Sequence, residues 1–215
     1  MAATLTYTSL FETVKDYLER DDQHLVGEIP LFIMLGQRRI AHDFKILGLK
    51  TFISGNMSPG DPVIRKPSQW LDNSTFNIGT NDIGQTNFQT RIQVLQRGYE
   101  YCRMYWPDPT VRDQPKYYCD YDFFTWFVSP TPDDTYPFEI AYFETPTLID
   151  LVTQTNWVTQ NIPEVLIYAT LLETATYLKD DDRVPVWTTF YNTAKEAVNR
   201  EDQQRLVDNY SVRGL

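Results

Sequence analysis

The chain has 215 residues, including 5 Trp, 14 Tyr and 12 Phe, and its net charge is −10. This length and aromatic content favour one folded domain, with or without a sizeable insertion, and exclude a disordered chain. The acidic charge argues against a protein that wraps DNA or reads its sequence, because both need a basic surface, although an acidic wall would let a duplex slide past.

Three further features bear on the compartment. No apolar run approaches the roughly 18–20 residues that cross a bilayer, so we expect no contact with a membrane. The first residues have neither the basic start nor the apolar core of a signal peptide. Cys102 and Cys119 are too few for a disulfide framework and lack metal-ligand spacing, which predicts two buried thiols in a chain made in a reducing cytoplasm.

The first fifty residues predict two helices. Residues 9–20 begin with the capping-box pattern Ser9-x-x-Glu12 and continue with an apolar stripe at helical spacing. A second helix is expected over about residues 28–47, with Pro30 in its first turn, where proline is tolerated. Gly36 in the middle of that helix predicts the close approach of another helix.

Residues 49–145 differ in composition from the segment before them, because Gly and Pro recur throughout. The short runs of β-type residues between them predict strands at Thr51–Ser54, Val63–Arg65, Tyr117–Tyr121, Phe123–Val128 and Phe138–Phe143. Residues 129–135 are expected to join the last two strands as an antiparallel connection, and residues 99–106 to form a short helix. Residues 72–90 are polar and aperiodic, which predicts a long, mobile loop.

The last third returns to helix as a predicted hairpin. Its first helix has the pattern Asn161-x-x-Glu164 with Pro163 in the first turn, and it is apolar almost all round. Such a helix is buried from several sides, either at the centre of its own domain or under a neighbouring copy of the chain. The turn at residues 180–182 is expected to cap the second helix, which runs to residue 198.

Together these elements predict an α+β protein, mainly α, in which a helical bundle has a β-rich insertion and an extended C-terminal tail. The bundle is expected to comprise residues 1–50 and 147–198, because neither helical part buries its apolar faces alone. The insertion is expected at residues 51–146 and the tail at residues 199–215.

No pattern in the sequence predicts catalysis, a metal site or a cofactor. The two histidines, His24 and His42, have no partners at ligand spacing and are expected on the surface. Asp120 and Asp122, set among aromatic residues, could belong to a sugar-binding strand or a glycosidase pair. A strand with one aromatic core face and one solvated face produces the same pattern, and we favour that interpretation.

A longer pattern extends from the last predicted strand into the final helix. It comprises Tyr142, Phe143, Pro146, Leu148, Thr155, Asn156, Trp157, Leu166, Tyr168, Ala169, Glu173, Ala175, Tyr177, Leu178, Lys179, Asp180, Asp181, Trp187 and Tyr191. This pattern resembles the adaptor (head-tail connector, or head-completion) proteins of tailed bacteriophages. The helix with Ile29, Pro30, Ile33 and the Arg38–Arg39 pair, followed by a β insertion, is similar to that family too.

The resemblance implies a structural virion protein located in the head–tail neck and assembled in the host cytoplasm. Its copies would form a ring of twelve around the channel of the packaged dsDNA. The ring would join the portal protein to the next neck or tail component, such as a tail nozzle or tail terminator. An alternative from another class is a virion-associated glycan-binding or cell-wall hydrolase module that uses residues 117–127.

The resemblance also implies two groups of interaction residues. The C-terminal segment would reach onto the portal through Arg205, Leu206, Val207, Tyr210, Val212, Arg213 and Leu215. The helical hairpin would provide the core or the contacts between subunits through Trp157, Tyr168, Leu172, Tyr177, Trp187 and Tyr191.

Overall fold

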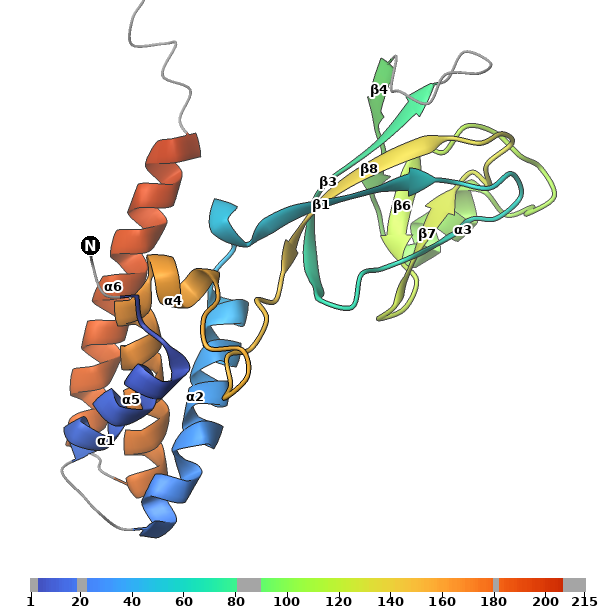
Figure 1. Ribbon diagram of the computed structural model, residues 1–215. Coiled ribbons are helices and arrows are strands. Elements are labelled where there is room, and N and C mark those ends of the chain that lie inside the picture. Colours follow the sequence, from blue (N-terminus) through green and yellow to red (C-terminus); the bar gives the residue numbers. More distant parts are fainter. Residues whose placement is uncertain (1–3, 19–22, 81–89, 180–181, 207–215) are drawn as a thin grey trace, which may run out of the picture. The chain divides into compact units, whose positions relative to one another are not determined.

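The computed structural model describes residues 4–18, 23–80, 90–179 and 182–206 (Figure 1). Two compact units divide the chain, one comprising Met1–Leu49 with Thr145–Leu215 and the other Lys50–Glu144. The first unit is helical and the second contains all the strands of the described residues.

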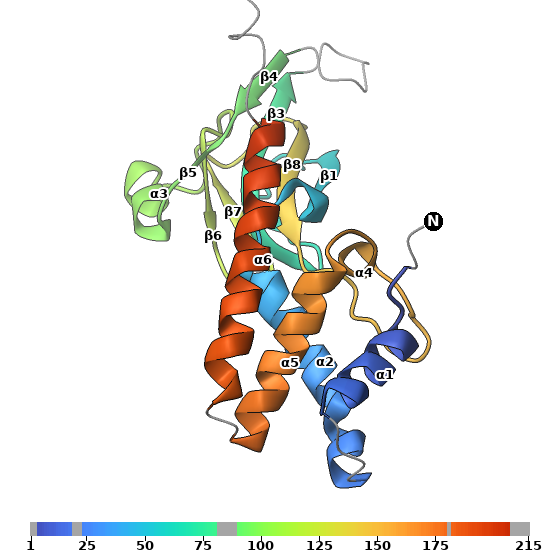
Figure 2. The ribbon, with the colours of Figure 1, turned by 90° about the vertical axis from the view of Figure 1, so that its left-hand side faces the viewer.

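The helical unit is built around one central helix (Figure 2). Its elements are α1 (Tyr7–Leu18), α2 (Gln23–Asp43), the short 3-10 helix η1 (Leu47–Leu49), α4 (Trp157–Asn161), α5 (Pro163–Leu178) and α6 (Arg183–Leu206). Helix α5 packs against α1, α2, α4 and α6. These neighbours explain why the sequence of α5 is apolar on several faces.

Helices α2 and α5 approach each other closely at a glycine, as the sequence predicts. A Cβ atom on Gly36 would lie 3.0 Å from the backbone nitrogen of Thr170, so any larger residue would push the helices apart. Ile29, Ile33 and Leu166 are fully buried in the core around this contact.

Two predicted helix boundaries are wrong. Helix α2 begins at Gln23, which places Pro30 in its interior rather than in its first turn. Helix α6 continues to Leu206, so residues 199–206 are helical and not an extended tail. The polar composition of residues 199–206 concealed this helix from the sequence analysis. The segment is helical because it continues a packed helix and so needs few apolar contacts of its own.

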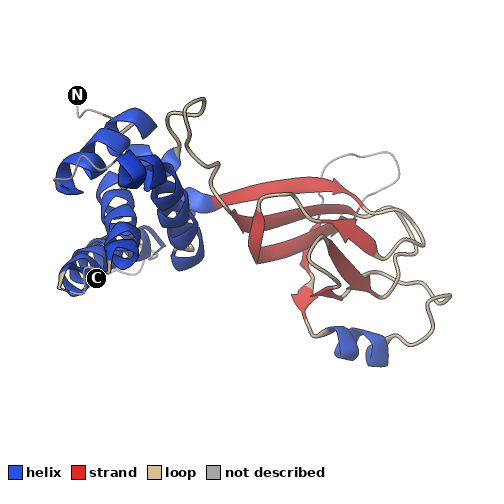
Figure 3. Ribbon diagram, turned by 90° about the horizontal axis from the view of Figure 1, so that it is seen from below, coloured by secondary structure: helices blue, strands red, loops and turns tan. Residues whose placement is uncertain are grey.

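The β unit consists of two sheets of four strands each (Figure 3). Its elements are β1 (Lys50–Asn56), β2 (Val63–Arg65), β3 (Trp70–Thr80), β4 (Thr90–Gln93), β5 (Leu95–Gln96), α3 (Tyr99–Tyr105), β6 (Tyr117–Asp120), β7 (Thr125–Ser129) and β8 (Pro137–Glu144). The strand orders are β1-β8-β3-β4 and β2-β7-β6-β5, and only the β5–β6 pair is parallel.

The inner faces of the two sheets share one core, as in a β-sandwich. Phe76 and Ile140 come from the first sheet, and Tyr118 and Trp126 come from the second. On the outer face of the second sheet, α3 covers β6 and β7, where Cys102 is buried with Cys119 and Phe127.

Two predictions for the β unit are wrong. Residues 72–80 form most of β3 rather than a loop, and β3 is bonded to β8 on one side and to β4 on the other. The rest of that predicted loop, residues 81–89, lies outside the described residues. Residues 129–135 do not join a hairpin, because β7 and β8 belong to different sheets.

The prediction of a mainly α protein is therefore wrong. The described residues are 47% helical and 24% strand, with two four-stranded sheets beside six helices. The error came chiefly from β3 and from the short strands β4 and β5. Their many polar side chains hide the alternation of apolar and polar residues by which a strand is recognised in a sequence.

Candidate assembly surfaces

Four aromatic side chains gather on the surface of the helical unit, along α1, α5 and α6. Tyr168 stacks on Phe190 with ring centroids 5.6 Å apart, and its ring lies 6.4 Å from that of Trp187. Tyr17 meets Trp187 edge-on at 5.7 Å. Phe190 is 47% exposed, so a large part of this cluster faces solvent. We call these four residues the aromatic face.

Two of the predicted packing residues, Leu172 and Tyr191, belong to the core instead of the surface. The Tyr191 hydroxyl donates to Asp43 Oδ2 at 2.8 Å, and Lys195 Nζ lies 3.2 Å from the same oxygen. Burial, together with the Asp43 carboxylate, raises the pKa of Tyr191 above its usual value, so the phenol stays neutral. This network joins α2 to α6.

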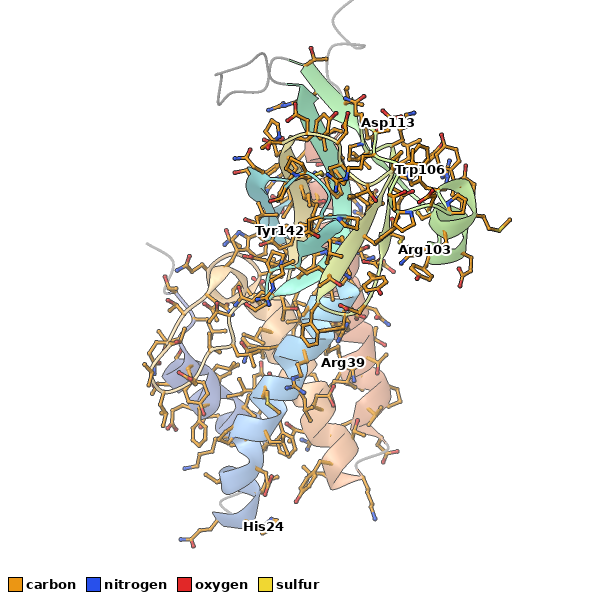
Figure 4. All side chains as sticks on the ribbon, turned by 90° about the vertical axis from the view of Figure 1, so that its right-hand side faces the viewer. His24, Arg39, Arg103, Trp106, Asp113 and Tyr142 are labelled. Carbon is orange, nitrogen blue, oxygen red and sulfur yellow. The ribbon has the colours of Figure 1, made fainter. Side chains whose placement is uncertain are left out.

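A second polar contact joins α2 to α5. The Arg39 Nε donates to Glu173 Oε1 at 2.7 Å (Figure 4 labels Arg39). The remaining predicted packing residues lie elsewhere on the helical unit. Tyr177 is exposed on α5 with its ring 5.0 Å from that of Phe32, and Trp157 is partly buried against the core.

The loop that follows β8 presents two exposed apolar side chains, a feature that the sequence did not reveal. Leu151 is 77% exposed and Val152 is 91% exposed. Asp150 Oδ1 accepts the backbone N–H groups of Val152 and Thr153, at 2.7 and 2.6 Å, which fixes the turn. We call Leu151 and Val152 the apolar turn.

The base of the same loop is also held in place. Gln154 accepts a hydrogen bond from the backbone N–H of Thr8 through its side chain, and its backbone carbonyl accepts one from Tyr7. The apolar turn is thus a rigid projection rather than a loose loop end. A sequence signal was present in Asp150, since Asp at the start of a turn commonly bonds the backbone two residues on.

The last turns of α6 contact the segment that leads into the β unit. Asp202 Oδ1 accepts the backbone N–H of Leu47 at 2.9 Å. A pocket of about 270 Å³ adjoins this contact and is lined by Trp157 and Arg205, among others. Of the predicted portal-binding residues, Arg205 pairs with Glu201 and Leu206 is exposed at the helix end. Val207, Tyr210, Val212, Arg213 and Leu215 lie outside the described residues.

The acidic strand considered for glycan binding or hydrolysis is occupied by structural contacts. Asp120 Oδ1 pairs with the buried Lys66 Nζ at 2.6 Å. Asp122 Oδ1 accepts the backbone N–H of Phe124 at 2.6 Å, and this bond holds the pKa of Asp122 below its usual range. Both carboxylates therefore stabilise the β6–β7 turn.

Other reactive groups have no catalytic arrangement in the described part of the chain. His24 and His42 are exposed on α2 (Figure 4 labels His24). Burial raises the pKa of the Cys119 thiol to about 12, which makes it unreactive. Within the described ranges, no three His, Cys, Asp or Glu side chains lie close enough to hold a metal ion, and no helix is long and apolar enough to span a membrane.

Comparison of the chain with known proteins identifies its family. A search of curated proteins gave no match. A family model described as SU10 adaptor protein matches residues 5–213, and so includes the helical unit, the β unit and the C-terminal segment. The chain therefore belongs to the SU10 adaptor protein family and is a structural component of a phage virion.

Proposed function

We propose that copies of this chain form a ring of twelve that joins the portal to the next neck or tail protein and surrounds the DNA channel. The observation that supports this most is the presence of two different exposed apolar features on one helical unit. They are the aromatic face, on α1, α5 and α6, and the apolar turn after β8.

These two features lie on different sides of the helical unit. Figure 2 shows the loop that follows β8 on the side of α1, to whose first turn it is bonded, and α6 on the other side of α5. A copy cannot cover its own aromatic face with its own apolar turn, but the turn of one copy can reach the face of the next. Contacts between two unlike surfaces are heterologous, and they generate a ring when the rotation between copies closes.

Each remaining partner is assigned to one part of the chain. The C-terminal segment from Arg205 onward would bind the portal, where a polar segment with spaced apolar anchors can become ordered. The β unit would face the neck or tail protein. The net charge of −10 suits a ring whose lumen lets DNA pass without holding it. Assembly would take place in the host cytoplasm, and the ring would remain in the neck of the virion.

We do not propose the glycan-binding or hydrolase alternative. Its two candidate carboxylates, Asp120 and Asp122, are engaged with Lys66 and with the backbone of Phe124. A general acid or a nucleophile needs a carboxyl group that can reach a substrate.

Variants of the two apolar features test the proposal. Phe190→Asp on the aromatic face, or Leu151→Asp with Val152→Asp on the apolar turn, should prevent rings from forming on the purified portal, because a charge would be buried in the contact between copies. Phe123→Ser with Phe124→Ser is the matched control, since these β-unit side chains are 72% and 71% exposed and rings should form normally. Negative-stain imaging gives the readout. Rings formed equally well by all variants would show that these features are not the contacts.

A further inference from the structure

Strand β2 is the edge of its sheet, and part of its backbone is unpaired. The Pro62 carbonyl accepts the N–H of Val128 at 2.8 Å, and the N–H of Lys66 donates to the Phe124 carbonyl at 2.8 Å. Since antiparallel bonding alternates along a strand, Val63 and Arg65 direct their backbone groups away from β7.

Only one of these outward groups has a partner among the described residues. The N–H of Val63 donates to Asp61 Oδ1 at 3.0 Å. The carbonyl of Val63 and both backbone groups of Arg65 make no hydrogen bond within the described ranges. An exposed edge of this kind can pair with an extended segment of another chain.

A pocket of about 310 Å³ adjoins this edge, with Val63 on its wall. The side chains of Trp106, Tyr121 and Phe127 line it, so most of its surface is apolar. Its size lies at the small end of the range for ligand pockets, roughly 300–1,000 Å³, and suits one or two side chains of a peptide.

A cation that pairs with no carboxylate of the described residues lies in the same pocket. The Arg103 guanidinium lies over the ring of Phe127, 4.6 Å from its centroid, and its Nε donates to the Tyr99 hydroxyl at 2.9 Å (Figure 4 labels Arg103 and Trp106). No carboxylate of the described residues is within ion-pair distance of it. A guanidinium fixed on aromatic rings is a ready receptor for a carboxylate.

Two more residues, Arg65 and Thr131, belong to the surface around this edge and pocket. The side chain of Arg65 lies on the same strand face as Val63, two residues along, and contributes a second positive charge. Thr131 also lines the pocket and is only 4% exposed.

We propose that the outer edge of β2 and this pocket together bind an extended peptide segment that carries a carboxylate next to an apolar side chain. The peptide backbone pairs with Val63 and Arg65, its carboxylate binds Arg103, and its apolar side chain contacts Tyr121 and Phe127. The segment belongs to a neighbouring protein of the particle, so the inference rests on the proposed function and names the chemistry by which the β unit holds its partner.

A random peptide library displayed on yeast and selected on the full-length protein provides the probe. The enriched peptides should combine an Asp or Glu with an adjacent apolar residue. Arg103→Gln should weaken their binding by about tenfold or more, because bonds to a charged partner are lost. Arg97→Gln is the matched control, since Arg97 also lies over aromatic rings, those of Tyr101 and Tyr117, outside the pocket, and it should leave the affinity unchanged.

A second pair of variants tests the strand edge without depending on Arg103. Arg65→Pro removes the outward N–H, which an edge strand tolerates, whereas Arg65→Gln removes only the charge. The proline variant should bind the peptides more weakly than the glutamine variant, and thermal melts should show that both are folded. N-acetyl-glutamate as a competitor distinguishes a free acid from a peptide.

The proposal fails if no peptide is enriched, if Arg103→Gln binds as tightly as the parent, if the two Arg65 variants bind equally, or if N-acetyl-glutamate competes as well as the peptides. These outcomes are separate from the proposed function, because peptide binding requires neither a portal nor a ring. A chain that binds such peptides but forms no ring would support this inference and contradict the proposed ring.

Discussion

Gln37 and Ile149, 112 residues apart in sequence, are joined by a two-way contact between an amide side chain and a backbone. The Gln37 Oε1 accepts the N–H of Ile149 at 2.8 Å, and its Nε2 donates to the Ile149 carbonyl at 3.5 Å. Gln37 is 2% exposed, so this contact is made in the core. It fastens α2 to the loop that presents the apolar turn, and so links the stability of the helical unit to the position of a candidate contact.

Replacing Gln37 should therefore lower the stability of the protein. Gln37→Leu leaves the N–H of Ile149 without its partner, and we expect the free energy of unfolding to fall by about 1–3 kcal/mol. Urea denaturation measures the change. The neighbouring Arg38 is exposed, and Arg38→Gln should change the free energy of unfolding by about 0.5 kcal/mol or less. Equal effects of the two substitutions would mean that the Gln37 contact contributes nothing.

Two glycines of the helical unit should respond in opposite directions to alanine. A Cβ atom on Gly48 would lie 1.9 Å from the Trp157 ring, so Gly48→Ala should destabilise the protein by about 1–3 kcal/mol through overpacking. A Cβ atom on Gly27 would meet nothing within 4 Å, and this glycine lies within α2. Gly27→Ala should therefore stabilise the protein by about 0.5–1 kcal/mol. Thermal melts that move in the same direction for both variants would contradict this account.

The raised pKa of Tyr191 should make the folded protein less stable at alkaline pH. Its pKa in the folded protein is raised above the ordinary value of 10.0, first by burial and then by Asp43. The neutral phenol is therefore favoured in the folded state. This contribution is fully present below pH 10, and it declines as the pH rises above 10, because the unfolded chain then loses the proton more easily than the folded one.

The matched variant is Tyr191→Phe, which has no proton to lose. It should be less stable than the parent by about 1 kcal/mol near neutral pH, since the bond to Asp43 is lost. The difference between the two proteins should shrink when urea denaturation is repeated above pH 10. A difference that stays constant with pH would show that the Tyr191 hydroxyl ionises equally in both states.

Two truncations separate folding from portal binding. Deleting residues 207–215 leaves α6 intact and should weaken attachment to the portal without changing the melting temperature. Deleting residues 200–215 also removes Asp202, which accepts the N–H of Leu47, and should lower the melting temperature as well. Pull-down on the portal together with a thermal melt gives both readouts. Unchanged portal binding by both truncations would mean that the portal contact lies elsewhere.

The sequence predicted the elements best where apolar residues repeat regularly. The predicted strand at Val63–Arg65 has the observed bounds, and the predicted helix at 99–106 differs from α3 by one residue. The central helix α5 was recognised because it is apolar on several faces and has Pro163 in its first turn. By contrast, β3 has few apolar residues, among them Phe76 and Ile78 in the core, and its pairing with strands on both sides outweighs its polar composition.

The starts of α1 and α2 were predicted too late, and both predicted capping boxes were wrong, although α5 begins at Pro163 as expected. The capping pair of α1 is Thr6 with Ser9, since each side-chain oxygen accepts the other residue's backbone N–H. The capping box of the hairpin is Asn156 with Thr159, at the start of α4. Both pairs have a hydroxyl residue where the usual pattern has Glu or Gln, so the predicted pairs with Glu12 and Glu164 were wrong.

The candidate surfaces were predictable only in part. The aromatic residues of α5 and α6 were found, because their spacing along a helix shows which side chains share a face. Which of them are buried and which face solvent could not be predicted, since Tyr191 is buried and Tyr168 is only partly buried because of their tertiary surroundings. The pocket beside β2 brings together residues from β2, α3 and β7, and no local pattern relates such distant segments.

The central claim is that this family member assembles on the portal as a ring, and one measurement tests it most directly. The purified chain is mixed with the portal of the same phage, and the mass of the complex is determined by light scattering while particles are imaged by negative stain. We expect many copies per portal, arranged as a closed ring with one central opening. A portal that binds no copies, or only isolated copies without contact between them, would contradict the account.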